Sequence, residues 1–455
     1  MTATATHTAS ISASRTPRAG FDPRLESTVE NVHAGRRLSF EDGMLLYETP
    51  DVWTVCALAD FVRRRLHGDV AYYNINRHLN YSNICALSCK FCAFYRKKDQ
   101  DGAYEHSLDD IRAQAIKAAE SGATEMHIVG GLHPWLPFEY YTDMMRTIRD
   151  AAPNLHIKAF TAVEVVHLAR ISKRGKDGYE GIKTVLVELK DAGLGSLPGG
   201  GAEVFDDRVH DEAYKGKIRA GTWLDVHRAA HEIGLNSNAT MLYGHIEQRA
   251  DRVKHMMTLR EAQDAALNRL GLTIDDFRLT IGNPDTSAAE PQRTQRASDS
   301  KKDALRPQPL CGESSRQSSI INRQLPPGYF QTIIPLPFFP NDSELEHLPA
   351  PTGLENLRTL AVSRLMLDNF PHVKAFWIMQ SLQMAQFMLQ NGADDIDGTV
   401  VWYDITKLTG DTTHQEVTVL DLQRAIREAG FRPVERDTLY RPVLRDGKLW
   451  RVAGG

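Results

Sequence analysis

The chain of 455 residues has few cysteines, no long apolar run and no excess of charge of either sign. Lys and Arg together number 54 and Asp and Glu 58, and the net charge of −4 creates no field that would attract nucleic acid. No apolar stretch approaches the roughly 20 residues that a membrane-spanning helix needs. Met1–Arg18 is rich in Thr, Ala and Ser and lacks the apolar segment of a secretory signal. We therefore expect a cytoplasmic protein that has no membrane span and does not bind nucleic acid.

The scarcity of cysteine also excludes a disulfide framework. Three of the five cysteines, Cys85, Cys89 and Cys92, are clustered at Cys-x3-Cys-x2-Cys spacing. A disulfide within this group would leave one thiol over, and Cys56 and Cys311 are isolated in the sequence. This usage is typical of a reducing cytoplasm. With 42% hydrophobic and 25% charged residues, the composition is that of a globular protein with a large core, built as one barrel or as two domains.

The three clustered thiolates can converge on one inorganic centre. A four-iron cluster normally takes four thiolates, so three would leave one iron open to a substrate. A zinc ion would need a fourth Cys or His at a matched spacing, and His78 is poorly placed for that. Phe91 and Phe94 beside the third cysteine would form an apolar collar that keeps water from a reducible cluster. Three buried and inert thiols are the alternative interpretation.

Strand and helix patterns alternate along most of the chain. Three helices, Leu25–Gly35, Ser39–Tyr47 and Val52–His67, come first. The expected strands, with helical segments between them, are Val70–Ile75, Glu125–Val129, His156–Phe160, Ser237–Leu242, Gln331–Pro335 and Ala375–Trp377. Repeated β–loop–α units predict a parallel sheet closed as a (β/α)8 TIM-type barrel, with an open doubly wound sheet as the runner-up. In either architecture, ligands bind at the carboxyl ends of the strands.

Composition divides the chain into five segments. They are a disordered tail (1–23), N-terminal helices (24–68), the first part of the barrel (69–270), a polar insertion (271–327), and the completion of the barrel with a C-terminal segment (328–455). The insertion is dominated by Ser, Gln, Arg, Asp and Pro and has no sustained apolar period. We expect it to be a disordered surface segment, and a segment that docks a partner is the alternative.

Two loops that follow predicted strands fall on the same rim as the cysteines. Gly130-Gly131 would let backbone amides approach a ligand closely, or form a plain tight turn. His133 in this loop is a candidate substrate contact or general acid–base group, although a lone His is often structural. After the next strand, Thr161 and Glu164 reach the rim. A Glu there could hold ribose hydroxyls or an amine, or simply favour a helix N-terminus.

Two later stretches also belong to this rim. Pro198–Gly201 is glycine-rich but lacks the Gly-Lys-Ser/Thr of a phosphate-binding loop, so it favours close passage of backbone along an uncharged or carboxylate ligand. The other stretch runs out of a strand onto its C-terminal loop, where the chemistry of a barrel lies. Its polar residues are Asn238, Thr240, Tyr243, His245 and Glu247. Each of them alone is more often a satisfied core group than a catalyst.

The cysteine motif, with an aromatic residue before its last cysteine, resembles the signature of radical S-adenosylmethionine (SAM) enzymes. The resemblance implies that Cys85, Cys89 and Cys92 hold a [4Fe-4S] cluster and that the amine and carboxylate of SAM chelate the open iron. An electron from an external reductant of the flavodoxin or ferredoxin type would then release a 5′-deoxyadenosyl radical. The motif defines the superfamily and says little about the reaction.

From about Arg37 to Val443, interrupted by the insertion, the chain resembles one branch of that superfamily, aminodeoxyfutalosine synthase of menaquinone biosynthesis. The stretches that carry the resemblance are Tyr73–Asn80, the cysteine motif, His127–Tyr141, Pro198–Phe205, Asn238–Glu247, Leu348–Leu357 and Val434–Tyr440. Cyclic dehypoxanthinylfutalosine synthase and the FO synthase subunits share the cysteine motif and the barrel. His127–Tyr141 and Asn238–Glu247 suit the first branch best.

The resemblance implies a reaction and roles for the rim residues. The adenosyl radical would add to the vinyl carbon of 3-[(1-carboxyvinyl)oxy]benzoate, an aryl enolpyruvyl ether, to give 6-amino-6-deoxyfutalosine, bicarbonate and methionine. Gly130 and Gly131 would face the methionyl end of SAM, and Thr161 and Glu164 the nucleoside end. The candidates to grip the substrate carboxylates are His133, Tyr243, His245 and Arg77. A related radical enzyme with another acceptor, or a cluster-binding redox or interaction module without turnover, are the alternatives.

Four residues depart from the pattern of this branch. Phe339 stands where a His is expected, Trp402-Tyr403 replaces two glutamates, and Lys407 stands where a His is usual. These changes concern the substrate end of the pocket rather than the fold or the cluster. We expect them to leave turnover ordinary, with Tyr403 or Lys407 making up the lost contact.

Overall fold

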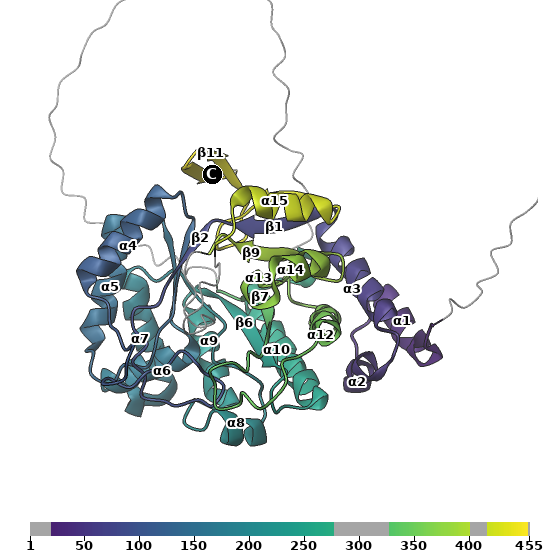
Figure 1. The fold of residues 1–455 in the computed structure, drawn as a ribbon, viewed down its shortest axis with the longest axis horizontal. Coiled ribbons are helices and arrows are strands. Elements are labelled where there is room, and N and C mark those ends of the chain that lie inside the picture. The colour runs from purple at the N-terminus through teal and green to yellow at the C-terminus, as the bar shows by residue number, and fades with distance from the viewer. Residues whose placement is uncertain (1–19, 277–326, 401–415, 454–455) are drawn as a thin grey trace, which may run out of the picture.

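A seven-stranded parallel sheet forms the centre of the fold (Figure 1). The computed structural model describes residues 20–276, 327–400 and 416–453, and its strands run in the order β2-β3-β4-β5-β6-β7-β8. They are β2 (Asn76–Leu79), β3 (Glu125–Ile128), β4 (His156–Ala159), β5 (Ser196–Leu197), β6 (Asn236–Tyr243), β7 (Phe330–Pro337) and β8 (His372–Val373). Strands that are consecutive in the chain are neighbours in the sheet, as repeated βαβ units require.

The sheet closes on itself through β9 (Asp395–Gly398) and β1 (Val70–Asn74). Lys374, directly after β8, forms a parallel bridge with Asp395, and β9 pairs in parallel with β1. Because β1 continues through Ile75 into β2, the seven strands of the sheet and β9 complete a ring of eight. The (β/α)8 barrel predicted from the sequence is confirmed, and the open doubly wound sheet is excluded.

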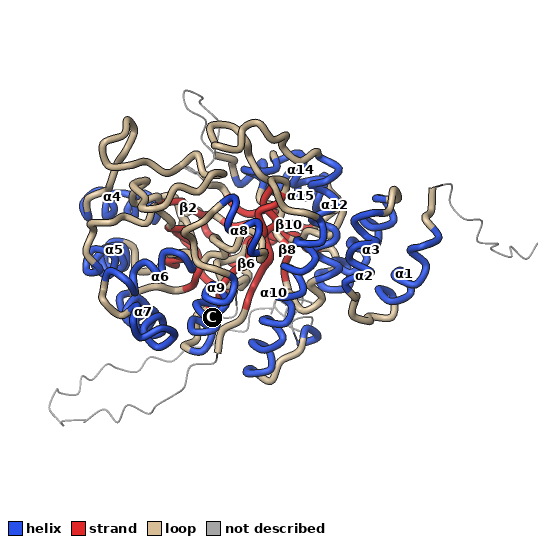
Figure 2. Tube along the Cα trace, turned by 90° about the horizontal axis from the view of Figure 1, so that it is seen from below, coloured by secondary structure: helices blue, strands red, loops and turns tan. Residues whose placement is uncertain are grey.

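Helices cover the outside of this ring, and the strands lie in the middle (Figure 2). The covering helices are α4 (Leu108–Glu120), α5 (Phe138–Ala151), α6 (Ala162–Ile171), α7 (Gly178–Ala192), α9 (Ala220–Glu232), α10 (Arg249–Leu270), α12 (Gly353–Met366) and α14 (Leu382–Leu389). Side-chain caps fix where several of them begin. Ser107 and Thr161 form capping boxes with the residues three positions later, Asp110 and Glu164. None of the helices in the described ranges is long and apolar enough to cross a membrane.

The N-terminal helices form a separate layer beside α10 and α12, at the right of Figure 1. They are η1 (Pro23–Leu25), α1 (Glu26–His33), α2 (Phe40–Glu48) and α3 (Val52–His67). Asp22, which the sequence analysis places in the tail, is buried and accepts a hydrogen bond of 2.8 Å from the Thr49 hydroxyl. Apart from its two ends, the predicted insertion (271–327) lies outside the described residues.

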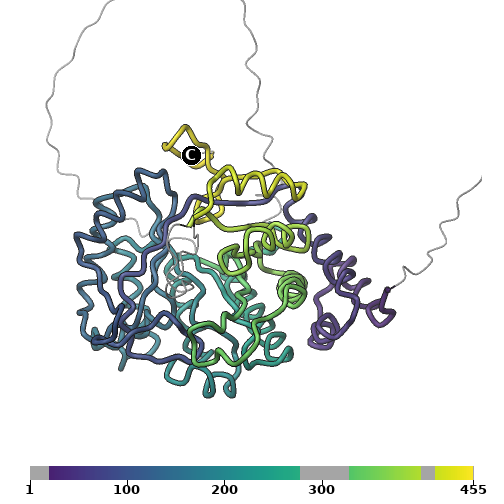
Figure 3. Tube along the Cα trace, viewed as in Figure 1, coloured from purple at the N-terminus to yellow at the C-terminus, as the bar shows by residue number. Residues whose placement is uncertain are grey.

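The C-terminal segment returns to the beginning of the barrel. Figure 3 shows α15 (Val419–Glu428), in yellow, lying beside the start of the barrel, in dark blue. After this helix, β10 (Arg432–Glu435) pairs in parallel with β1, from Val70 opposite Arg432 to Tyr73 opposite Glu435. A hairpin of β11 (Val443–Asp446) and β12 (Leu449–Val452) follows. The β1 strand is therefore held on both edges by residues more than 300 positions away.

Several strands differ from the sequence-based expectation. The predicted strand Ala375–Trp377 is wrong: β8 lies earlier, at His372–Val373, and Trp377 begins the short helix α13 (Trp377–Gln380). The Trp377 indole instead donates a hydrogen bond of 2.8 Å to the Gly398 carbonyl. The sequence analysis missed β5 because it has two residues next to glycines, and β9 because Asp and Gly are depleted in strands.

Five buried histidines make the fold sensitive to acid. Burial lowers the pKa to about 3 for His67, His227 and His255, and to about 4 for His78 and His156. The unfolded chain binds protons at these residues near pH 6.5. Between that pH and the folded-state pKa values, the unfolded state holds more protons, so stability falls as pH falls.

We therefore expect the free energy of unfolding to drop by about 1 kcal/mol per histidine, several kcal/mol in total, between about pH 7.5 and about pH 5.5. Urea unfolding of the anaerobic protein at both pH values measures the difference. A stability that is equal at the two pH values would contradict the folded-state burial of these rings.

Candidate active site

A cavity of about 300 Å³ lies at the carboxyl ends of the barrel strands. Its lining comes from the cysteine loop after β2, the Gly130-Gly131 loop after β3, Thr161 and Glu164 after β4, and Pro198–Gly201 after β5. Side chains of β6 and β7 complete the wall. The chain thus brings the three cysteines and four predicted cofactor-binding residues together around one space, where a TIM barrel has its active site.

Backbone hydrogen bonds hold the cysteine loop against the loop after β3. The Ala86 amide donates to the Leu132 carbonyl at 2.9 Å. Cys85 Sγ accepts from the amides of Leu87 and Leu132, both at 3.4 Å. The first cysteine is therefore held in position on the cavity wall by its own loop and by the neighbouring one.

The other two cysteines are more deeply enclosed and have a cation beside them. Burial raises the pKa of Cys89 to about 11 and also raises the pKa of Cys92. The Lys217 ammonium opposes this shift at both thiols; it forms an ion pair with Glu203 and lies 4.8 Å from the centre of the Phe91 ring. A buried thiol gives up its proton when a metal binds, and Lys217 supplies a compensating positive charge.

The three thiols line one wall of the cavity. In the described part of the chain, the one set of three ligand-type side chains with all ligand atoms within 4.8 Å is His67, His372 and Asp394, so the cysteine sulfurs are not drawn together into a compact three-ligand set. Three thiols on one cavity wall fit a cluster that keeps one iron for a ligand.

The glycines of the loop after β3 are required by the packing of the chain itself. A Cβ on Gly130 would lie 2.6 Å from the Tyr81 ring, and one on Gly131 would lie 2.3 Å from the Ile84 carbonyl oxygen. Tyr81 and Ile84 belong to the segment that leads into the motif, so the close approach brings the cysteine loop onto β3. Both glycines also line the cavity. Their predicted contact with the methionyl end of SAM remains a prediction.

Glu164 is buried and joins three segments through four hydrogen bonds. Its Oε1 accepts from the Gly130 amide at 3.0 Å and from the Tyr81 hydroxyl at 2.9 Å. Its Oε2 accepts from the amide and the hydroxyl of Thr161, both at 2.7 Å. Burial raises the pKa of this carboxyl, and the hydrogen bonds oppose the rise. Glu164 lines the cavity, but its oxygens are engaged within the protein, so its predicted contact with a nucleoside remains untested.

Four predicted substrate-binding residues lie outside the lining of the cavity. The buried His133 accepts at Nδ1 from the amides of Trp135 and Leu136, and its Nε2 lies 2.8 Å from Glu105. Arg77 donates to the Asn76 carbonyl at 2.8 Å and to the Thr399 hydroxyl at 3.0 Å. The hydrogen bonds and ion pair of His133, and the hydrogen bonds of Arg77, therefore connect segments of the protein itself.

The remaining two, Tyr243 and His245, also have internal partners. The Tyr243 hydroxyl donates to Asn356 Oδ1 at 2.9 Å, and His245 Nε2 lies 3.2 Å from the Leu242 carbonyl. The Phe91 ring stacks near His245, with ring centres 6.4 Å apart. Roles of these four residues in substrate binding remain predictions.

The sequence analysis missed the charged residues at the floor of the cavity. Lys158 in β4, Lys374 after β8 and Asp397 in β9 all line it, as does His127 in β3. Strand periodicity could have indicated these residues, because side chains two positions apart in a strand lie on the same face of the sheet. A Lys inside a short, otherwise apolar strand is unusual, and in a barrel its side chain must point either to the lumen or to the helices.

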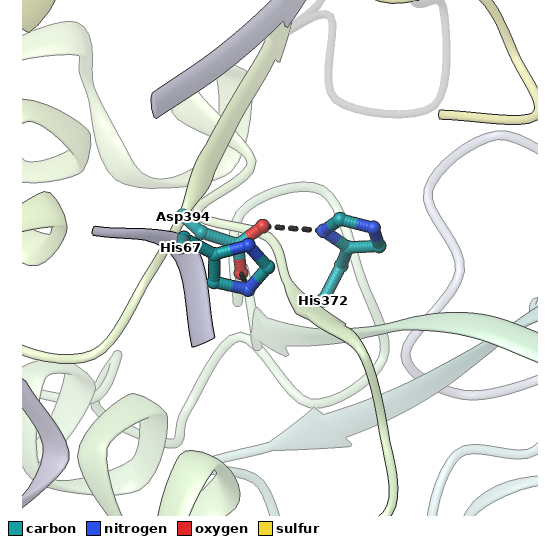
Figure 4. Close-up of side chains that lie close together, drawn as sticks. All are labelled: His67, His372 and Asp394. Carbon is teal, nitrogen blue, oxygen red and sulfur yellow. Dashed lines mark hydrogen bonds and ion pairs between the residues drawn. The ribbon is translucent and has the colours of Figure 1, made fainter. Parts of the chain in front are cut away.

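A second cluster of potential ligands lies at the opposite end of the barrel, where β8 and β9 begin (Figure 4). His372 Nδ1 lies 2.6 Å from Asp394 Oδ2, and His67 Nε2 lies 2.9 Å from the Pro371 carbonyl. Asp394 also forms an ion pair with the buried Arg364 guanidinium. A metal ion here would compete with that guanidinium for the same carboxylate, so the cluster is a structural hub that joins α3, α12, β8 and β9.

Comparisons with known proteins agree with this geometry. Residues 79–260 match the family model of the radical SAM superfamily, and residues 327–446 match that of the CofH/MqnC C-terminal region. The aminodeoxyfutalosine synthase of Thermus thermophilus is 37% identical over 93% of this chain and 96% of its own length. That of Streptomyces coelicolor is 39% identical over 94% of this chain and 95% of its own. A 5-amino-6-(D-ribitylamino)uracil–L-tyrosine 4-hydroxyphenyl transferase of Methanosphaerula palustris is 31% identical over 91% and 97%.

The barrel with its cysteine-lined cavity and these matches define the class: the chain is a radical SAM enzyme. Within the superfamily it belongs to the family that contains the aminodeoxyfutalosine synthases and carries the CofH/MqnC C-terminal region. Membership implies a [4Fe-4S] cluster, SAM, a small-molecule substrate and an external reductant. Cys85, Cys89 and Cys92 are the residues that fit the cluster.

Solved structures show the same fold at low sequence identity. Methylornithine synthase (PylB) superposes with a TM-score of 0.61 at 12% identity, over 89% of this chain and 96% of its own. The FeFe-hydrogenase maturase HydG from Carboxydothermus hydrogenoformans gives 0.56 at 13% identity, over 92% of this chain and 80% of its own. At these identities the likeness concerns the barrel and not the reaction.

Replacement of Cys89 by Ala should abolish the cluster, because two thiolates cannot hold three irons. Anaerobically reconstituted parent protein should contain about four iron and four sulfide per chain, and Cys89→Ala close to none. Cys56→Ala is the matched control, since Cys56 is buried in α3 and does not line the cavity. Iron and sulfide analysis measures both variants. Equal iron in Cys89→Ala and Cys56→Ala would contradict the assignment.

Replacement of Glu164 by Gln should destabilise the protein even without SAM. In Gln, an NH2 group replaces one of the two carboxylate oxygens and would face two groups that are themselves hydrogen-bond donors. These buried donors would then have no acceptor, at a cost of roughly 1–3 kcal/mol. Glu188→Gln, at a half-exposed ion pair with Arg174, is the control and should change stability by less than about 1 kcal/mol. Chemical unfolding of both variants tests this. Unchanged stability of Glu164→Gln would contradict the structural role of these four hydrogen bonds.

Proposed function

We propose that this enzyme is an aminodeoxyfutalosine synthase, which joins the 5′-deoxyadenosyl group of SAM to 3-[(1-carboxyvinyl)oxy]benzoate. The products would be 6-amino-6-deoxyfutalosine, methionine and bicarbonate, with water supplying the oxygen of the bicarbonate. The observation that supports this best is the identity of 37–39% to two aminodeoxyfutalosine synthases along nearly the whole of both chains. Relatives with other names reach 30–31%.

The cysteine residues and their neighbours would have the first task in this reaction. Cys85, Cys89 and Cys92 would hold the cluster, which when bound and reduced supplies the cleavage of SAM. Lys217 would offset the negative charge of the thiolates. Glu164 would keep the Gly130-Gly131 loop in place, so that its backbone lies beside the cosubstrate. The reductant would be a flavodoxin or ferredoxin in the cytoplasm.

The enclosed barrel would have the second task, to hold the aryl substrate dry and in one orientation. The cavity wall carries the aromatic side chains Phe94, Tyr95, Phe338 and Phe376 next to the cysteines and the glycine loops. Aromatic rings pack well against a benzoate ring. Exclusion of water protects a reactive radical, and a fixed orientation decides which carbon it attacks.

One position that departs from the branch pattern lies in this wall. Phe339 lines the cavity and its side chain is 39% exposed. It can offer apolar contact but no proton. Trp402, Tyr403 and Lys407 lie outside the described residues. Our expectation that turnover is ordinary despite these departures remains a prediction.

Product analysis separates this proposal from the other enzymes of the family. With SAM, a one-electron reductant and 3-[(1-carboxyvinyl)oxy]benzoate, the anaerobic protein should form the nucleoside adduct and methionine in equal amounts. The matched control replaces the aryl ether with tyrosine and 5-amino-6-(D-ribitylamino)uracil and should give no adduct. Mass spectrometry of the products measures both reactions. Free 5′-deoxyadenosine without adduct, or a product from tyrosine, would contradict the proposal.

A further inference from the structure

The lumen below the cysteines carries charge where a TIM barrel usually has branched aliphatic side chains. Lys158 and Lys374 are only 4% and 3% exposed, yet both line the cavity. Lys158 Nζ lies 2.5 Å from Glu125, and Lys374 Nζ donates to Asp397 at 2.7 Å. Burial of an ammonium group is costly even when it is paired, so these lysines call for an explanation beyond packing.

Both ammonium groups have hydrogen-bonding capacity to spare. Within the described ranges, each Nζ has one partner, the acid of its own ion pair. An ammonium group has three N–H donors, so up to two on each lysine can face the cavity. The pKa of Lys158 is lowered, chiefly by burial and also by the charge of Lys374, and Glu125 and Asp397 only partly oppose this shift. The two ion pairs therefore share one electrostatic environment.

A third nitrogen points to the same ligand chemistry. His127 lines the cavity one strand away from Lys158, in register with it across β3 and β4. Its Nε2 is buried and has no hydrogen-bond partner in the described part of the chain. Burial holds the pKa of this ring well below its usual range, so it is a neutral imidazole that can donate one hydrogen bond. Unpaired donors around one end of a cavity favour an anionic ligand.

We propose that Lys158 and Lys374, together with His127, bind the ring carboxylate of the substrate at the floor of the barrel. This assignment rests on the proposed function, which fixes the orientation of the substrate. The vinyl carbon must lie toward the cysteines, where the radical forms. The carboxylate on the aromatic ring is at the other end of the molecule and therefore points into the lumen. The enolpyruvyl carboxylate stays near the rim.

The test uses variants that remove each lysine together with its acid, so that no unpaired charge stays buried. These are Lys158→Met with Glu125→Gln, and Lys374→Met with Asp397→Asn. Asp397 has a φ of 71°, a conformation that Asn also tolerates. The matched control is Lys190→Met, a partly buried lysine of α7 that does not line the cavity. Iron content should match the parent in all variants, and SAM cleavage without substrate should match the parent in Lys190→Met.

Each double variant should lose roughly 10²-fold in kcat/KM for 3-[(1-carboxyvinyl)oxy]benzoate, mostly through KM, because a buried charged contact is lost. The parent should lose a similar factor with 2-phenoxyacrylate, which lacks the ring carboxylate. The double variants should show no further loss with that analogue, since the group that they fail to bind is already absent. The Lys190→Met control should behave like the parent with both compounds.

Failure of this assignment can be told apart from failure of the proposed function. If the parent forms the adduct while the double variants keep full kcat/KM, or lose equally with the substrate and with 2-phenoxyacrylate, the lysines do not bind the carboxylate. If the parent forms no adduct but binds benzoate by calorimetry, at least 10-fold more tightly than both double variants, the proposed function fails and the anion site stands. If the parent forms no adduct and its binding of benzoate does not depend on the lysines, both the carboxylate site and the proposed function are overturned.

Discussion

The buried carboxylate of Glu164 ties together the parts of the chain that must meet at the cysteines. It accepts hydrogen bonds from the Gly130 loop, from Tyr81 ahead of the cysteine motif, and from Thr161 at the start of α6. A carboxylate can be buried only when its oxygens are satisfied, and here every hydrogen bond comes from a different part of the rim or from its own helix cap. Loss of this group would remove the side-chain link between these segments and leave the backbone hydrogen bonds, such as that from the Ala86 amide to the Leu132 carbonyl, to hold the cysteine loop beside β3.

The two ends of the barrel have different roles: the amino ends of the strands contain a stabilising charged cluster, and the carboxyl ends surround the cavity of the candidate active site. At the amino ends of β8 and β9, Asp394 is enclosed by Arg364, His372 and the Val373 amide. At the carboxyl ends the cysteines, glycine loops and lysines surround an open space. Both ends contain buried charge. The difference is that the carboxylate at the first end is engaged by the protein's own cationic and amide groups, whereas the charged side chains at the second end line a cavity.

The lumen explains how one barrel could hold a radical cofactor and a charged substrate. Aromatic side chains and glycine backbone form the upper wall, where the proposed reaction would need close, uncharged contact with an adenosyl group and an aryl ring. Charged side chains occupy the floor, where a carboxylate can be anchored away from the reacting carbon. A substrate with its anionic group at one end and its reactive carbon at the other would be aligned along the barrel axis. This separation lets electrostatic binding fix orientation without placing charge beside the radical.

The sequence by itself determined the barrel and the clustering of the three cysteines, because both depend on local spacing: alternating strands and helices, and Cys-x3-Cys-x2-Cys. It also identified the glycine and Glu164 loops, since a parallel barrel gathers the carboxyl ends of its strands. It did not show which polar side chains line the cavity. Lys158 and Lys374 do, whereas the predicted His133, Tyr243, His245 and Arg77 lie outside the lining and have partners inside the protein. Only the tertiary structure decided this, because the direction of a side chain depends on the closure of the ring, and that closure joins β1 to strands more than 300 residues away.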